Sequence, residues 1–231
     1  ALQAHLLRPR RHPVGLPRQR PQLPARGLRP PRAGAVLPRL RRLLPHLHEA
    51  QQRVVGLVRR GQITKDFLQA ERFLHPLRQA DVPQANTLAN SLQQAYMELL
   101  PTRTLLVPHA REVLDYLHGR YTLSIVSNGF VEVQYRKIRN SGIAGYFDHI
   151  VLSEEAGALK PDKRIFEHAL RLNDARPDET LMVGDLYQAD IAGAQNASID
   201  QAYFNWRGTP LPPANAPTYT IRSLRELMEI L

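Results

Sequence analysis

Leu181-Met-Val-Gly-Asp-Leu-Tyr-Gln-Ala-Asp-Ile191 is the stretch of sequence that decides the fold. An apolar run reaches Gly184 and stops at Asp185, which is typical of a buried parallel strand ending in a turn. Carboxylates at the carboxyl end of such a strand lie where open α/β sheets bind ligands. Asp185 and Asp190 can therefore converge on an oxygen-seeking cation such as Mg²⁺, although Asp185 alone is equally consistent with a helix cap.

The residues around this stretch alternate between strand and helix patterns. Strands are predicted at residues 121–127, 149–152, 181–183, 201–204 and 218–221, and helices at residues 108–117, 131–141, 165–172, 185–194 and 223–231. Strands that alternate with helices predict an α/β fold with a doubly wound parallel sheet. We expect residues 104–231 to form this core.

Residues 61–103 have a helical pattern and no strand signal. Thr64 is suited to cap a first helix, and Pro83 and Pro101 bound a second one. The sequence therefore predicts a small helical cap inserted into the core.

Composition excludes several classes of protein. The 231-residue chain has no Cys, which excludes disulfides, zinc–thiolate sites and thiol catalysis. No apolar run approaches the roughly 20 residues of a membrane helix, and nothing resembles a signal peptide. We expect a cytoplasmic protein with no membrane partner.

The net charge of +10 would by itself suggest a nucleic-acid partner, but the charge is confined to one end. Residues 1–60 hold 14 Arg, no Lys and one acid, Glu49, whereas the other residues hold 17 bases and 20 acids. Residues 1–60 also carry 9 of the 19 prolines and contain no Phe, Tyr, Trp, Ile, Ser or Thr. This Arg/Pro-rich segment is expected to be disordered, and its composition differs from that of the rest of the chain.

The genetic code offers an explanation for this segment. Residues 7–15 can be encoded as CTT CGA CCT CGA CGA CAC CCT GTG GGA. Read one base later, the same bases give TTC GAC CTC GAC GAC ACC CTG TGG, or Phe-Asp-Leu-Asp-Asp-Thr-Leu-Trp. We infer that the reading frame is lost before Leu7 and restored near Arg60–Gly61, where ordinary mixed composition resumes.

Polar residues follow three successive predicted strands: Ser127, Lys160, and the Asp185/Asp190 pair. A hydroxyl with the amides of Asn128 and Gly129 can hold phosphoryl oxygens, and a lysine supplies a positive charge for a dianion. Each residue alone is more simply a turn or surface residue, so the signal lies in their common location.

In this order and spacing, these motifs resemble the haloacid dehalogenase superfamily of phosphohydrolases. The resemblance covers about residues 61–231, and Gly61-Gln-Ile-Thr-Lys-Asp-Phe, Ser127-Asn-Gly-Phe and Gln134-Tyr-Arg-Lys look most like the pyrimidine 5′-nucleotidase branch. It implies that Lys160 and Ser127 are catalytic, that Ser127, Asn128, Gly129 and Lys160 bind the substrate phosphate, and that Asp185 and Asp190 hold Mg²⁺. The substrate would be a phosphate monoester, with a nucleoside 5′-monophosphate the first choice.

The family's first motif, Asp-x-Asp-x-Thr, supplies the nucleophilic Asp and the acid/base Asp. It is absent from the chain as printed, and the shifted frame restores it. We therefore expect the printed chain to be inactive and to fold poorly, because the first, central strand of the sheet is missing or corrupted.

Two other interpretations remain open. In the first, a non-enzymatic phosphatase-like module carries a genuine basic arm that binds nucleic acid. In the second, the enzyme is a haloacid dehalogenase, but the restored second Asp favours phosphate chemistry.

Overall fold

The computed structural model describes residues 4–9, 65–212 and 214–231. In chain order, its strands and main helices are β1 (Ala4–Pro9), α2 (Lys65–Gln79), α3 (Ala85–Leu99), α4 (Ala110–Leu117), β2 (Tyr121–Ser127), α5 (Val131–Asn140), β3 (His149–Leu152), α6 (Ser153–Ala156), α7 (Lys163–Leu172), β4 (Leu181–Gly184), α8 (Ala192–Asn196), β5 (Asp200–Phe204), β6 (Tyr219–Ile221) and α9 (Leu227–Ile230). Short 3₁₀ turns join several of them, and a π-helical turn, η4 (Tyr187–Ile191), lies between β4 and α8.

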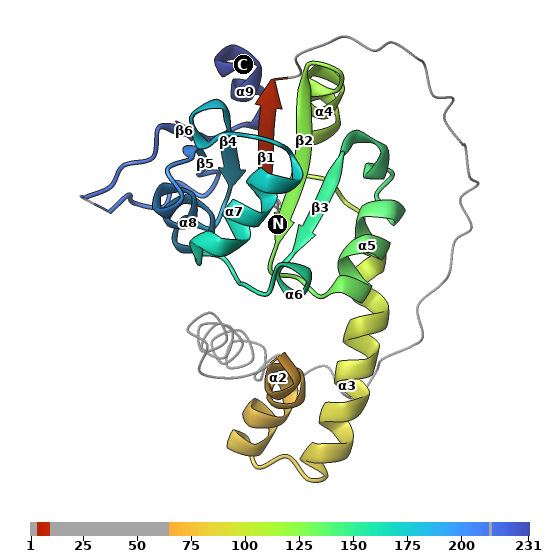
Figure 1. Ribbon diagram of the computed structural model, residues 1–231. Helices are drawn as coiled ribbons and strands as arrows, with labels where there is room; N and C mark the ends of the chain where they lie inside the picture. Colours follow the sequence, from red (N-terminus) through yellow and green to blue (C-terminus); the bar gives the residue numbers. More distant parts are fainter. Residues whose placement is uncertain (1–3, 10–64, 213) are drawn as a thin grey trace. The chain divides into compact units, whose positions relative to one another are not determined.

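One six-stranded sheet organises the core, with the strand order β3-β2-β1-β4-β5-β6 (Figure 1). β2 pairs with β3, β4 with β5, and β5 with β6, all in parallel. Parallel strands separated by helices confirm the predicted α/β fold class. The carboxyl ends of β2, β3, β4 and β5 therefore meet at one edge of the sheet, which is where such folds bind ligands.

The central strand of the sheet was expected to be missing or corrupted. Six residues form a strand at this position, and they run antiparallel to both neighbours: His5 pairs with Ile125 and Val183, and Pro9 pairs with Tyr121 at the amino end of β2. The strand is therefore reversed and not missing. Backbone hydrogen bonds form in either strand direction, so a short segment such as residues 4–9 can pair between β2 and β4 without the sequence of the expected strand. Pro9 has no N–H to donate and ends the strand.

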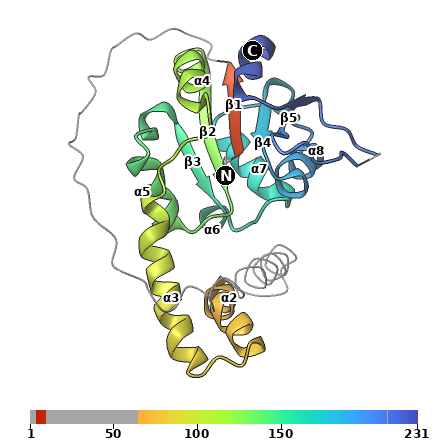
Figure 2. The same ribbon diagram turned by 180° about the vertical axis from the view of Figure 1, so that it is seen from behind.

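Helices cover both faces of the sheet, as the two opposite views in Figures 1 and 2 show. One face packs on α7 and α8 through a buried cluster that includes Val126, Phe166 and Met182. The other face packs on α4 and α9 through a cluster that includes Leu123 and Val183. Successive strand residues point to opposite faces, which explains why neighbours such as Met182 and Val183 belong to different clusters.

α2 and α3 belong to a second unit, residues 15–98, whereas residues 1–14 and 99–231 make the first. Phe73 and Tyr96 join the two helices by an edge-to-face contact with ring centroids 5.8 Å apart, and Leu77 and Ala89 are buried. Both predicted helices are thus present, and their role as a cap stays a prediction. Most of the Arg/Pro-rich segment predicted at residues 1–60 lies outside the described residues.

Within the described part of the chain, no helix has the length and apolar character needed to cross a membrane.

Candidate active site

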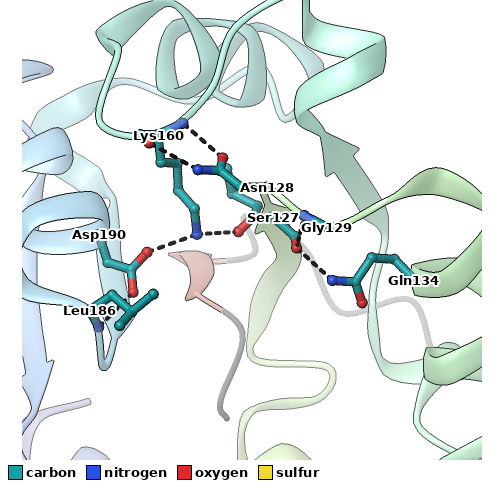
Figure 3. Close-up of polar contacts among 8 residues, drawn as sticks. Ser127, Asn128, Gly129, Gln134, Lys160, Leu186 and Asp190 are labelled. Carbon is teal, nitrogen blue, oxygen red and sulfur yellow. Dashed lines mark hydrogen bonds and ion pairs between the residues drawn. The ribbon is translucent and has the colours of Figure 1, made fainter. Parts of the chain in front are cut away.

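Ser127 ends β2, and its hydroxyl oxygen is held by two donors (Figure 3). The Gln134 side chain donates from Nε2 at 2.9 Å, and the Gly129 backbone N–H donates at 3.1 Å. A hydroxyl has two acceptor lone pairs and one O–H donor, so these contacts use its acceptor capacity and leave the donor. The Ser127 O–H can therefore donate to an oxygen atom of a bound ligand. The contact with Gln134 was not predicted, because Ser127 ends a strand and Gln134 lies on the following helix, so no single periodicity relates them.

Lys160 and Asp190 form a buried ion pair at the same edge of the sheet (Figure 3). Lys160 Nζ lies 2.8 Å from Asp190 Oδ1 and donates to the Val126 carbonyl at 2.7 Å. The two side chains are only 6% and 2% exposed, so solvent screens their attraction weakly. Two of the three ammonium N–H groups are thus engaged by described residues, and the third is available to an anion.

Asn128 joins the loop after β2 to the loop that carries Lys160. Its side chain accepts from the Lys160 backbone N–H at 2.8 Å and donates to the Lys160 carbonyl at 2.9 Å. This two-sided contact fixes the backbone of Lys160, so Asn128 positions the lysine. The predicted use of the Asn128 and Gly129 amides for substrate binding stays a prediction.

Gly184 is required because Asp190 lies directly against the end of β4. A Cβ built on Gly184 would be 2.5 Å from Asp190 Cβ and Oδ2, closer than real Cβ atoms approach. Asp190 is held there by the Leu186 N–H, which donates to Oδ2 at 3.0 Å, and by its own N–H, which donates to the Leu186 carbonyl at 2.7 Å. The π-helical turn η4 thus folds Asp190 back over the strand and onto Lys160.

Substituting Gly184→Ala should therefore destabilise the fold. The added methyl must displace Asp190 from the buried pair, and overpacking of this kind costs about 1–3 kcal/mol. Urea unfolding followed by circular dichroism would measure the loss. Gly145→Ala is the matched control, because a Cβ there meets nothing within 4 Å. Equal losses in the free energy of unfolding for the two variants would show that the packing of Asp190 does not require a glycine at position 184.

Asp185 follows β4 and has a pKa above its ordinary value. Burial is the main cause and repulsion from Asp190 the second, while the positive charge of Arg207 partly offsets both. The raised pKa means that ionising this carboxyl costs free energy in the folded protein, and a bound divalent cation would lower that cost. No group of three His, Asp or Glu side chains able to hold a metal ion occurs among the described residues. The assignment of Asp185 and Asp190 to Mg²⁺ therefore stays a prediction.

The Asp185 carboxylate should make the metal-free protein less stable at neutral pH. Its pKa is raised in the folded state, so the charged carboxylate destabilises the fold. This destabilisation begins as the pH rises above the ordinary pKa of 3.8 and is complete once the pH exceeds the folded-state pKa. We expect Asp185→Asn to raise the melting temperature at pH 7 in a chelating buffer, and this advantage to vanish in acid. Asp178→Asn is the control, because the Asp178 side chain is 70% exposed. An Asn variant at position 185 that melts below the parent at pH 7 would contradict this assignment.

An apolar cavity of about 320 Å³ lies elsewhere in the first unit. It is lined by residues of α4, α5 and the strands that flank β1, such as Val113, Ile138, Leu123 and Val183. None of the candidate site residues lines it, so it is separate from the candidate active site.

Comparison with known proteins places these features among hydrolases. The family model described as haloacid dehalogenase-like hydrolase matches residues 29–198. The chain is 34% identical over 173 residues to the pyrimidine 5′-nucleotidase YjjG of Escherichia coli (strain K12), covering 74% of each chain. It is 39% identical over 93 residues to a glyceraldehyde 3-phosphate phosphatase of Methanothermobacter thermautotrophicus, covering 40% of this chain and 41% of that one.

A solved structure with the same fold is that of the HAD-hydrolase YfnB from Bacillus subtilis bound to magnesium. It matches with a TM-score of 0.74 and 30% sequence identity, and the match covers 82% of each chain. This likeness confirms the α/β architecture of the core.

Proposed function

The chain belongs to the haloacid dehalogenase-like hydrolases, and from the geometry of its site we propose that the intact enzyme hydrolyses a nucleoside 5′-monophosphate. Homologues named as nucleotidases and phosphatases already imply a small phosphate-ester substrate. The nucleotide, the aspartyl-phosphate route and the use of Mg²⁺ are our inference.

The observation that carries the proposal is a pair of donors at one edge of the sheet that none of the described residues engages. These donors are the Ser127 O–H and one Lys160 N–H. Lys160 also donates to the carbonyl of Val126, the residue before Ser127, so both side chains lie at the same strand end. Donors that are fixed before the ligand arrives stabilise a dianion without reorganisation. A phosphoryl group supplies several acceptor oxygens and matches both donors.

The reaction also needs a nucleophile, which we propose is the Asp that the shifted frame places at position 8. Its carboxylate would attack phosphorus and release the nucleoside, and water would then cleave the aspartyl-phosphate. The restored Asp at position 10 would first protonate the leaving oxygen and then deprotonate the water. Asp185, with Asp190 and the restored nucleophile, would hold Mg²⁺, which offsets negative charge on the phosphoryl group.

In the chain as printed, this chemistry cannot be assembled. Position 8 holds Arg, and Arg8 pairs with Thr122 near the amino end of β2, at the edge opposite Ser127. Position 10 lies outside the described residues.

A substrate panel would test the proposal. We expect the frame-restored protein, with residues 7–60 translated from the shifted frame, to release phosphate from UMP in a Mg²⁺ buffer faster than from glyceraldehyde 3-phosphate. Halide release from a 2-haloacid should be absent. Preference for the aliphatic phosphate would reject the nucleotidase assignment, and halide release without phosphate release would favour the dehalogenase.

A further inference from the structure

The turn after β5 presents an aromatic side chain at the edge of the sheet that carries the candidate active site. Residues 201–205 are all buried, and the next residue, Trp206, is 52% exposed. β5 is parallel to β4 and adjacent to it, so its carboxyl end lies at the same edge as Asp185, about 4.8 Å away in the direction across the sheet. Trp206 stands two residues beyond that end.

This turn has a fixed conformation. The Asn205 side chain donates to the Thr209 carbonyl and accepts from the Thr209 N–H, both at 2.8 Å. Gly208 adopts a φ of +64°, a region that favours glycine, and donates to the Asn205 carbonyl at 3.1 Å. The Asn205 N–H also bonds to Ile221 at 2.8 Å, which anchors the turn to β6. Trp206 is therefore held in place by its backbone and not by burial of its ring.

Arg207 contacts the indole ring, with its guanidinium carbon 4.4 Å from the ring centroid. Such a cation–π contact pre-orients both side chains. A half-exposed indole beside a guanidinium offers a flat apolar surface together with N–H donors.

We propose that Trp206 and Arg207 bind the nucleobase of the substrate, with the base stacked on the indole and the guanidinium donating to a base carbonyl. This inference rests on the proposed function, and it assigns the recognition of the leaving group to the turn after β5. It distinguishes a nucleotide from an aliphatic phosphate, because only the nucleotide has a planar π-face to stack.

Trp206 is the only tryptophan in the chain, so its fluorescence reports on this position alone. The chain as printed lacks the nucleophile, which allows a substrate to be titrated without turnover. In a Mg²⁺ buffer, we expect UMP to quench Trp206 fluorescence in a saturable manner, and inorganic phosphate to reverse the quenching by competition. Ribose 5-phosphate should bind more weakly and leave the fluorescence nearly unchanged.

Calorimetry on variants separates the base site from the phosphate site. Trp206→Ala should weaken UMP binding roughly 5- to 150-fold, the range that one base–aromatic stack contributes, and leave ribose 5-phosphate binding unchanged. Trp206→Tyr should recover most of the loss. The matched control is Tyr219→Ala, since Tyr219 is 41% exposed but lies on β6, where it pairs with Ala202 in the middle of β5 and not with the turn after β5.

Two results would overturn the inference. One rejects the nucleobase site alone, and the other rejects the proposed function as well. If UMP and ribose 5-phosphate bind equally and Trp206→Ala changes neither, the base site is wrong while the phosphate site stands. If a chain shown to be folded by circular dichroism binds none of the three phosphates, the proposed function falls as well.

Discussion

The chain as printed should show no turnover of UMP above background, and replacing residues 7–60 by the translation of the shifted frame should restore it. Loss of the nucleophile in a covalent mechanism typically lowers the turnover rate about 10⁶-fold. We therefore expect the frame-restored protein to turn over UMP at least roughly 10⁴-fold faster than the chain as printed. Phosphate release measured under identical conditions for both proteins would give the ratio. The frame-restored protein with Asn in place of the first restored Asp is the control and should be inactive.

A second variant separates the missing carboxylates from the missing strand. Arg8→Asp with Arg10→Asp gives the printed chain both acids of the first motif. In the structure, however, β1 runs antiparallel, and position 8 pairs with Thr122 near the amino end of β2. The new carboxylate at position 8 would thus lie at the wrong edge of the sheet. We expect this double variant to stay inactive, and turnover by it would show that β1 runs parallel to its neighbours.

The second large effect should come from Lys160→Met. This substitution leaves the Asp190 carboxylate, 2% exposed, without the ammonium that lies 2.8 Å away. Breaking a buried ion pair on one side costs about 3–5 kcal/mol, because the remaining charge stays out of water. Urea unfolding should show this loss in the free energy of unfolding at neutral pH.

The partner variant and a surface control make the interpretation specific. Lys160→Met combined with Asp190→Leu should lose clearly less than Lys160→Met alone, since replacing both charges by apolar groups is often nearly neutral. Lys163→Met is the control: its ion pair with Glu167 is solvent-exposed, and such pairs contribute about 0.3–0.5 kcal/mol. A double variant as unstable as the single one would show that packing, and not charge, explains the loss.

The alternation of strand and helix patterns was sufficient to predict the core. Ser127 and Asp185 were located correctly at strand ends, because an apolar run that stops at a polar residue fixes both the strand and its terminus. The helices at residues 65–79 and 85–99 were also predicted closely, from their periodicity and from the prolines beside them.

Three features could not be predicted from the same patterns. The direction of β1 is not encoded in six residues, because either direction satisfies their backbone hydrogen bonds. The contacts of Gln134 with Ser127 and of Asn128 with Lys160 join segments that only the folded sheet brings together. The exposure of Trp206 depends on the turn that Asn205 and Gly208 form, which no strand or helix pattern in the sequence indicates.

The most direct test of this account is the DNA sequence that encodes residues 1–65. We predict that, read one base later from codon 7, it spells Phe-Asp-Leu-Asp-Asp-Thr and continues without a stop until the frames rejoin near Gly61. The protein would then be an intact phosphohydrolase once its frame is corrected. Codons that confirm the printed frame and give another sequence when shifted would contradict the account, and the basic-arm interpretation would take its place.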